Sequence, residues 1–177
     1  KTTVSSDLKL DGLKILVDCA NGAAYKLIPQ TIRELGAEVV PMSVDPNGFN
    51  INLECGSTNP RRAQEAVLAE KADLGLCLDG DADRVLLIDE SGKIADGDQV
   101  MALLAKSWMT KGFLKENTLV STVMSNLAFE MFLKDIGIKL IRTNVGDRHV
   151  SERMLAGGFN LGGEQSGHII LSDFSST

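Results

Sequence analysis

Three aspartates at alternate positions, Asp79, Asp81 and Asp83, are the residues best suited to chemistry, and Arg84 follows them directly. They come immediately after the apolar run 74–78, which predicts a buried strand. Carboxylates this close repel one another, and a divalent cation would remove the repulsion. Carboxylate oxygens are hard ligands that suit Mg²⁺ or Ca²⁺, and the small residues between the aspartates let the backbone curl around one ion. We therefore predict that the three aspartates hold a metal ion.

A dedicated metal loop competes with three alternatives for this acidic segment. A solvated acidic turn does not require an acid at every second position, so it accounts poorly for the spacing. An EF-hand would place Glu90 at its twelfth position, but its sixth position needs glycine and holds Arg84. An aspartyl-phosphate phosphatase, in which a strand ends in Asp-x-Asp and the first aspartate attacks phosphorus, stays open. Against it, three aspartates in one loop make a complete metal site and leave none free to attack.

A second polar loop, 163–168, reads Gly-Glu-Gln-Ser-Gly-His and stands just before an apolar run. Carboxylates and hydroxyls such as those of Glu164 and Ser166 are suited to binding the hydroxyl groups of a sugar. A histidine at the start of a strand is more often structural than catalytic, but the polar neighbours of His168 favour a role in proton transfer.

A third loop, 143–149, lies between an expected strand and an expected helix, where backbone N–H groups can face an anion. This position makes Gly146 and Asp147 candidates for substrate binding, and Arg148 would add a two-pronged phosphate contact. A purely structural role, with Asp147 as a helix cap and Arg148 in solvent, fits the sequence equally well.

Short apolar runs alternate with longer segments of helical periodicity along the chain, a pattern typical of α/β layers. We therefore predict two consecutive three-layer α/β domains with mixed, mainly parallel sheets, a metal-binding one over residues 1–97 and a sugar-recognition one over 98–177. The Asn- and Gly-rich stretch 45–60 is expected to be a surface or site loop. The expected strands are 13–18, 39–42, 73–78, 85–89, 118–124, 138–142, 159–161 and 168–171. The expected helices are 25–35, 61–71, 99–111, 126–136 after Ser125 as its N-cap, and 148–156.

The composition excludes several classes of protein. A formal net charge of −6, with no basic cluster larger than Arg61-Arg62, argues against a nucleic-acid partner. No apolar run reaches the roughly 18 to 20 residues that span a bilayer, and residues 1–4 lack the start of a signal peptide, so no membrane partner and a cytoplasmic location are expected. The three cysteines form no CxxC pair and are expected to be buried apolar side chains. The missing initiator Met and the polar end at 172–177 suggest a piece of a longer protein.

The three loops, in this order, resemble the motifs of the α-D-phosphohexomutase superfamily, and most closely those of its phosphoglucosamine branch. Residues 79–84 match an Asp-Gly-Asp-x-Asp-Arg metal loop, 163–168 match a Gly-Glu-x-Ser-Gly-His sugar loop, and 143–148 match the branch's Thr-x-Val-Gly-Asp-Arg segment. Residues 17–23 and 96–99 support the resemblance, which extends over nearly the whole chain.

The resemblance implies the second and third domains of a four-domain enzyme, the third of them truncated at its C-terminal end. The missing first and fourth domains of the same chain would bring a phosphoserine and a clamp for the substrate phosphate. The intact enzyme would interconvert glucosamine 6-phosphate and glucosamine 1-phosphate through a bisphosphorylated intermediate, whereas the isolated piece would be inactive.

The resemblance also implies roles for single residues. The three aspartates would hold Mg²⁺, and Arg84 would neutralise phosphoryl charge. Glu164 and Ser166 would hold sugar hydroxyls, and His168 would assist proton transfer. Two alternatives remain: a phosphomannomutase or phosphoglucomutase, whose branches share two of the three motifs, and a non-catalytic module that binds a metal or a sugar phosphate.

Overall fold

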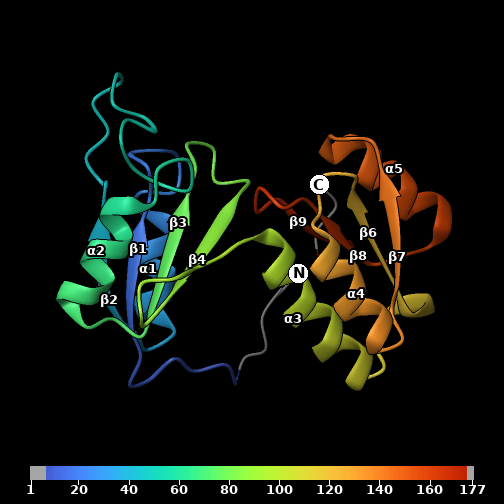
Figure 1. Ribbon diagram of the computed structural model, residues 1–177. Coiled ribbons are helices and arrows are strands. Elements are labelled where there is room, and N and C mark those ends of the chain that lie inside the picture. Colours follow the sequence, from blue (N-terminus) through green and yellow to red (C-terminus); the bar gives the residue numbers. More distant parts are fainter. Residues whose placement is uncertain (1–6, 175–177) are drawn as a thin grey trace. The chain divides into compact units, whose positions relative to one another are not determined.

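The computed structural model describes residues 7–174 (Figure 1). Residues 1–4, which the sequence predicts to lack a signal peptide, and the last three residues of the polar segment 172–177 lie outside the described part. The chain forms two compact units, one ending at Ala95 and the other beginning at Asp96. No helix in the described range 7–174 is long and apolar enough to cross a membrane.

The first unit is built on a mixed five-stranded sheet in the order β2-β1-β3-β4-β5. Strands β1, β2 and β3 are parallel, and the hairpin strands β4 and β5 add antiparallel to β3. Its elements are β1 (Lys14–Asp18), α1 (Leu27–Glu34), β2 (Glu38–Met42), α2 (Arg61–Glu70), β3 (Leu74–Leu78), β4 (Val85–Asp89) and β5 (Ile94–Ala95).

The first sheet is covered on both faces because its interior strand β1 is apolar on both sides. In β1, Ile15 and Val17 belong to the core cluster that also contains Ile32 of α1. Leu16, which points the other way, packs in the cluster that contains Val67 of α2. Since side chains alternate along a strand, α1 and α2 cover opposite faces of the sheet and complete three layers (Figure 1).

The second unit has a mixed four-stranded sheet in the order β7-β6-β8-β9, with β6, β7 and β8 parallel and β9 antiparallel. Leu119 of β6 packs with α3 and α4, whereas Val120 packs with α5 on the other face. The elements are α3 (Gly97–Thr110), a 3₁₀ turn (Lys115–Asn117), β6 (Thr118–Thr122), α4 (Leu127–Asp135), β7 (Lys139–Thr143), α5 (Asp147–Gly157), β8 (Leu161–Gly163) and β9 (Ile169–Leu171).

The two units share one topology despite their different sequences. Strands β1, β2, β3 and β4 and strands β6, β7, β8 and β9 have the same order in their sheets and the same pairing directions. The acidic loop connects β3 to β4, and the Glu-Gln-Ser-Gly-His loop connects β8 to β9. Both candidate loops are thus the same hairpin connection of a repeated fold, and the predicted fold class of two α/β/α domains with mixed sheets is confirmed.

Several predicted boundaries are wrong: the strand expected over 118–124 ends at Thr122, and the helix expected over 25–35 begins at Leu27. Three other differences have a clear local reason. Helix α3 begins at Gly97, two residues earlier than expected, because Asp96 and Gln99 form a reciprocal capping box. The N-cap of α4 is Asn126, because the hydroxyl of Ser125 donates to Asp98 instead. Strand β8 begins at Leu161, since residues 158–160 complete the left-handed end of α5, where Phe159 N–H donates to the Met154 carbonyl.

The three cysteines are free and buried, as expected. Burial, with a smaller contribution from the negative charge of Asp18, raises the pKa of the Cys19 thiol to about 11 and that of Cys77 to about 12. Burial also raises the pKa of Cys55.

We expect the folded chain to resist thiol alkylation at pH 8, because a rise from 9.0 to about 11 alone lowers the thiolate fraction of Cys19 by about a hundredfold. Mass spectrometry after iodoacetamide treatment, with and without denaturant, checks this.

The folded state binds these protons more tightly than the unfolded state, so its stability is also expected to fall as the pH rises from about 9 toward 12. Rapid labelling of the native chain at pH 8 would contradict both expectations.

Candidate functional site

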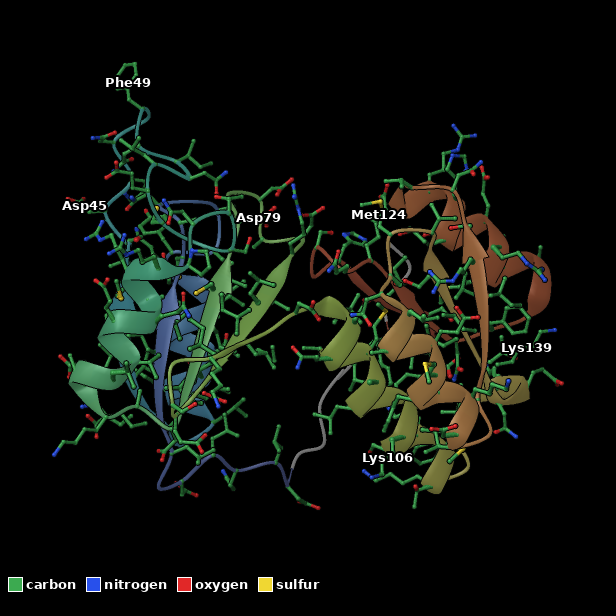
Figure 2. All side chains as sticks on the ribbon, in the orientation of Figure 1. Asp45, Phe49, Asp79, Lys106, Met124 and Lys139 are labelled. Atoms are coloured by element: carbon green, nitrogen blue, oxygen red, sulfur yellow. The ribbon has the colours of Figure 1, made fainter. Side chains whose placement is uncertain are left out.

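The acidic loop brings its three carboxylates together at the end of β3. One oxygen each from Asp79, Asp81 and Asp83 lie within 4.8 Å of one another. Asp79, labelled in Figure 2, is buried, whereas the side chains of Asp81 and Asp83 are exposed. The turn is closed by the Ala82 N–H, which donates to the Asp79 carbonyl at 3.1 Å. The result is a cluster of hard oxygen donors, with one fixed member and two accessible ones.

Arg84 is fixed against this cluster. Its backbone N–H donates to Asp79 Oδ1 at 3.1 Å, and its Nε lies 2.9 Å from Asp79 Oδ2 and 3.4 Å from Asp83 Oδ1. Burial lowers the pKa of the Arg84 guanidinium, but attraction to Asp79, Asp83 and Asp81 outweighs that effect and raises it. Arg84 therefore stays cationic, and it partly balances the acidic cluster when no metal is bound.

The connection after β1 contacts the acidic loop. The sequence did not predict this contact. The Ala23 N–H donates to the Gly80 carbonyl at 2.8 Å. A Cβ at Gly22 would collide with that same carbonyl, so only glycine permits the approach. The signal in the sequence is the Asn21-Gly22 turn, which by itself predicts only a chain reversal.

The long loop between β2 and α2 also contacts the acidic loop. Ile51 lies against Gly80, because a Cβ added to Gly80 would fall 2.6 Å from Ile51 Cδ1. The buried carboxylate of Asp18 ties this long loop down, because it accepts hydrogen bonds from the N–H groups of Ala20 and Gly56 at 3.0 and 2.8 Å. Figure 2 shows Asp45 and Phe49 on this loop, at the same end of the first sheet as Asp79. The prediction that 45–60 is a surface or site loop agrees with this placement.

The structure favours a metal site formed by the acidic loop alone over an EF-hand. Carboxylate oxygens at this spacing suit a hard ion, and the contacts of Arg84 hold Asp79 in one orientation. Glu90, the twelfth position of an EF-hand, follows the far end of β4, whose Asp89 pairs with Leu74 at the start of β3. Glu90 is therefore separated from the acidic loop by the length of a strand.

The second candidate loop is a tight connection between β8 and β9. The Glu164 N–H donates to the His168 carbonyl at 2.8 Å, and the Gly167 N–H donates to the Glu164 carbonyl at 3.0 Å. Glu164 is half-buried, Ser166 is exposed, and His168 is buried with 8% of its surface accessible. A carboxylate and a hydroxyl thus reach solvent from a backbone that is held by its own hydrogen bonds.

The third candidate loop is joined to the second. The Gly146 N–H donates to Glu164 Oε1 at 3.0 Å, so this N–H is used by the carboxylate of the chain itself and is not directed at a ligand anion. Gly146 is also the N-cap of α5, and Asp147 is the first residue of that helix. The exposed Arg148 makes an ion pair with Glu152 one turn along the helix, at 2.8 Å. The structure therefore brings Gly146 to Glu164 and leaves Arg148 on the outer surface of α5.

Comparison with known proteins decides the family. Residues 1–92 match the family model described as phosphoglucomutase/phosphomannomutase, alpha/beta/alpha domain II. Residues 96–177 match the model of alpha/beta/alpha domain III of the same family. The chain belongs to the phosphoglucomutase/phosphomannomutase family. This membership confirms the resemblance to phosphohexomutases and disfavours the aspartyl-phosphate phosphatase interpretation of the acidic loop.

Within this family, the chain is similar to curated proteins named phosphoglucosamine mutase. It is 60% identical to the one from Dinoroseobacter shibae and 62% identical to one from Cereibacter sphaeroides, in both cases over all 177 residues. The chain spans 40% of the length of these two relatives.

Two solved structures of the family share the fold. A family protein from Burkholderia thailandensis superposes with a TM-score of 0.84 at 26% identity, over 96% of this chain and 37% of its own. The N-acetylphosphoglucosamine mutase of Aspergillus fumigatus, solved in complex with GlcNAc-6P and magnesium, superposes with a TM-score of 0.66 at 29% identity, over 95% of this chain and 38% of its own.

Proposed function

We propose that this chain is the metal-holding and sugar-recognising part of a phosphoglucosamine mutase, which interconverts glucosamine 6-phosphate and glucosamine 1-phosphate. The observation that carries the proposal is the convergence of three carboxylate oxygens within 4.8 Å at the β3–β4 hairpin, in a chain 60% identical to enzymes of that name. The whole protein would contain further domains, since the relatives are more than twice as long. One of these domains would supply the phosphoserine, and another the clamp for the substrate phosphate.

The two units would divide this work. The unit that ends at Ala95 would hold the metal, and the unit that follows would recognise the sugar. Each function resides on the same hairpin of the shared topology, β3–β4 in one unit and β8–β9 in the other.

Asp79, Asp81 and Asp83 would hold Mg²⁺, the ion present in the complex of the Aspergillus relative. When bound, Mg²⁺ would act as a Lewis acid on the phosphoryl group being transferred. Asp79 is the ligand with a fixed orientation, because Arg84 contacts both of its oxygens. A carboxylate oxygen has two lone pairs, so Asp79 can bind a cation without losing the Arg84 contact.

Arg84 would provide fixed positive charge near the phosphoryl group. Its side chain is 43% exposed and uses Nε for its contacts with the aspartates, so the rest of the fork can reach a phosphoryl oxygen. Charge that is oriented before the reaction stabilises the transition state without reorganisation.

Glu164 and Ser166 would bind sugar hydroxyls, and His168 would move a proton at the accepting hydroxyl. Glu164 Oε1 is bound to the Gly146 N–H, which leaves Oε2 for a ligand. Gly146 would therefore act on the substrate through Glu164. Asp147 and Arg148, which we propose as phosphate or sugar contacts, lie at the start of α5, and Arg148 would have to exchange its weak surface pair with Glu152.

We expect the 177-residue chain to show no mutase activity by itself, because the proposed reaction needs the phosphoserine of another domain. A coupled assay with glucosamine 6-phosphate, an activating hexose bisphosphate and Mg²⁺ checks this. The full-length protein should be active in the same assay, and a parallel test with mannose and glucose phosphates distinguishes the two alternative mutases. Turnover that scales with the amount of the isolated chain would contradict the proposed division of work. Inactivity of the full-length protein on all three sugars would favour a non-catalytic binding module.

A further inference from the structure

We propose that Asp98, Ser125, Ser121 and Gly97 form a buried platform that positions Glu164 for sugar binding. These four residues would touch neither metal nor substrate. They would act through the β8–β9 loop, as positioning residues. The proposal deepens the proposed function and rests on it, because Glu164 must bind the sugar for its position to matter.

Three close polar contacts connect the start of α3 to the β8–β9 loop, and the single protons of the two serine hydroxyls serve two of these contacts at a time. Ser125 Oγ donates to Asp98 Oδ1 at 2.7 Å and lies 2.7 Å from Ser121 Oγ. Ser121 Oγ donates to the Gly163 carbonyl at 2.8 Å. Asp98, Ser121 and Ser125 are 1%, 0% and 6% exposed, so water does not compete for these bonds. The Gly163 carbonyl, which belongs to the peptide bond leading into Glu164, is therefore held from inside the unit.

The other oxygen of Asp98 holds the chain in a second place. Asp98 Oδ2 accepts from the Asn126 N–H at 2.8 Å and from Asn126 Nδ2 at 3.0 Å. Asn126 is the N-cap of α4, and Asp98 itself lies in the first turn of α3. A carboxylate is favoured near helix N-termini. Asp98 thus fixes the two helix starts to each other, which gives the chain of hydroxyls a rigid origin.

Gly97 supports the loop from the same helix turn. Its N–H donates to the Gln165 carbonyl at 3.0 Å. A Cβ at this position would collide with the Glu164 carbonyl and lie 2.8 Å from the Gln165 carbonyl. Even an alanine would therefore push the loop away from the start of α3, and Gly97 is required by this close approach.

These contacts hold the backbone of Glu164 on both sides. Ser121 binds the carbonyl before it, Gly97 binds the carbonyl after it, and the Gly146 N–H orients the carboxylate. A loss of any one contact would let the carboxylate move, and small displacements of a binding group are costly. If the network served stability alone, its loss would lower the melting temperature without a selective effect on the loop or on sugar binding.

The first test measures the loop in this chain. Ser121→Ala should speed hydrogen exchange of the Glu164 and Gly167 amides severalfold, and up to about tenfold, as expected for a lost buried hydrogen bond. Thr118→Val is the matched control, because it removes a buried hydroxyl that donates to the Glu116 carbonyl from the other end of β6. Gly97→Ala is a second variant with the same expected effect. Equal exchange in Ser121→Ala and Thr118→Val would overturn the positioning role.

The second test measures sugar binding in the full-length protein. Ser121→Ala should raise KM for the sugar phosphate about tenfold, because the Gly163 carbonyl loses its hydrogen bond and Glu164 is no longer held in place. The Mg²⁺ concentration for half-maximal activity should stay unchanged. In a double-mutant cycle it should have no further effect in a Glu164→Ala background. Additive effects, or a changed Mg²⁺ requirement, would overturn the proposal. Faster loop exchange with an unchanged KM would instead show that Glu164 does not bind the sugar, which would contradict the proposed function.

Discussion

Replacing Asp81 by alanine in the full-length protein is expected to reduce kcat by about a thousandfold or more, because metal charge stabilisation supplies several kcal/mol as the phosphoryl group moves. Asp81 is exposed and belongs to the three-carboxylate cluster, so its removal breaks the ligand set without opening a cavity in the core. KM for the sugar phosphate should change much less, since the metal acts on the transition state. Steady-state kinetics at saturating Mg²⁺ measure both constants.

Metal binding to the isolated chain gives an independent test of the same cluster. Three carboxylates leave about three positions of an octahedral shell to other ligands, so we expect only millimolar affinity for Mg²⁺. Calorimetry should show that Asp81→Asn removes this binding and that Glu90→Ala, which changes an exposed acid beyond the far end of β4, does not. Micromolar affinity that is insensitive to Asp81→Asn would refute the assigned ligands, and an effect of Glu90→Ala would restore the EF-hand interpretation.

Replacing Glu164 by alanine is expected to lower kcat/KM about tenfold to a hundredfold, the range for lost hydrogen bonds to a charged group. KM should rise and kcat should fall together, because a contact with a sugar hydroxyl exists in the ground state and also orients the sugar for attack. The affinity for Mg²⁺ should be unchanged, since Glu164 lies in the other unit. Kinetics with varied sugar phosphate and varied Mg²⁺ separate these effects.

A conservative variant distinguishes the two roles of the Glu164 carboxylate. Glu164→Gln keeps an oxygen that can accept from the Gly146 N–H, but it removes the negative charge. If charge is needed for sugar binding, Gln and Ala variants should be impaired alike. If the main role is to hold the loop at Gly146, the Gln variant should retain most of its activity. If Glu164→Ala left KM unchanged and Asp81→Ala changed only KM, the roles assigned to Glu164 and Asp81 would be reversed.

The shared topology suggests why these two acidic sites are structurally alike. Each lies in the hairpin between the third and fourth strands of its unit, beside the loop that follows the second strand. In the first unit, the Ser57 N–H of that loop donates to the Leu78 carbonyl. In the second unit, the Gly146 N–H donates to the Glu164 carboxylate. One fold therefore provides a supported hairpin twice, and the side chains on it decide whether it suits a metal or a sugar.

Local sequence determined the elements of this protein and its candidate loops. The apolar runs 74–78 and 85–88 predicted β3 and β4 because short apolar runs are typical of strands in a sheet that is covered on both faces. The cluster of three carboxylates was predictable because Asp79, Asp81 and Asp83 lie within five residues, so the backbone of one turn brings them together. Where a side-chain contact competed with a local signal, prediction was wrong: Ser125 looked like an N-cap, but its hydroxyl is used by Asp98.

Only the tertiary structure decided which distant residues support each site. Gly22 meets Gly80, and Gly146 meets Glu164, because parallel strands bring their carboxyl ends to one edge of a sheet, and separations of 58 and 18 residues leave no periodic trace in the sequence. Asp98 shows the same limit. Its position, just before the expected helix 99–111, is typical of an acidic helix start. Its contacts with Ser125 and Asn126, and through Ser121 with Gly163, depend on how α3 and α4 pack against β6. Packing of this kind is set by the whole core, and no local pattern encodes it.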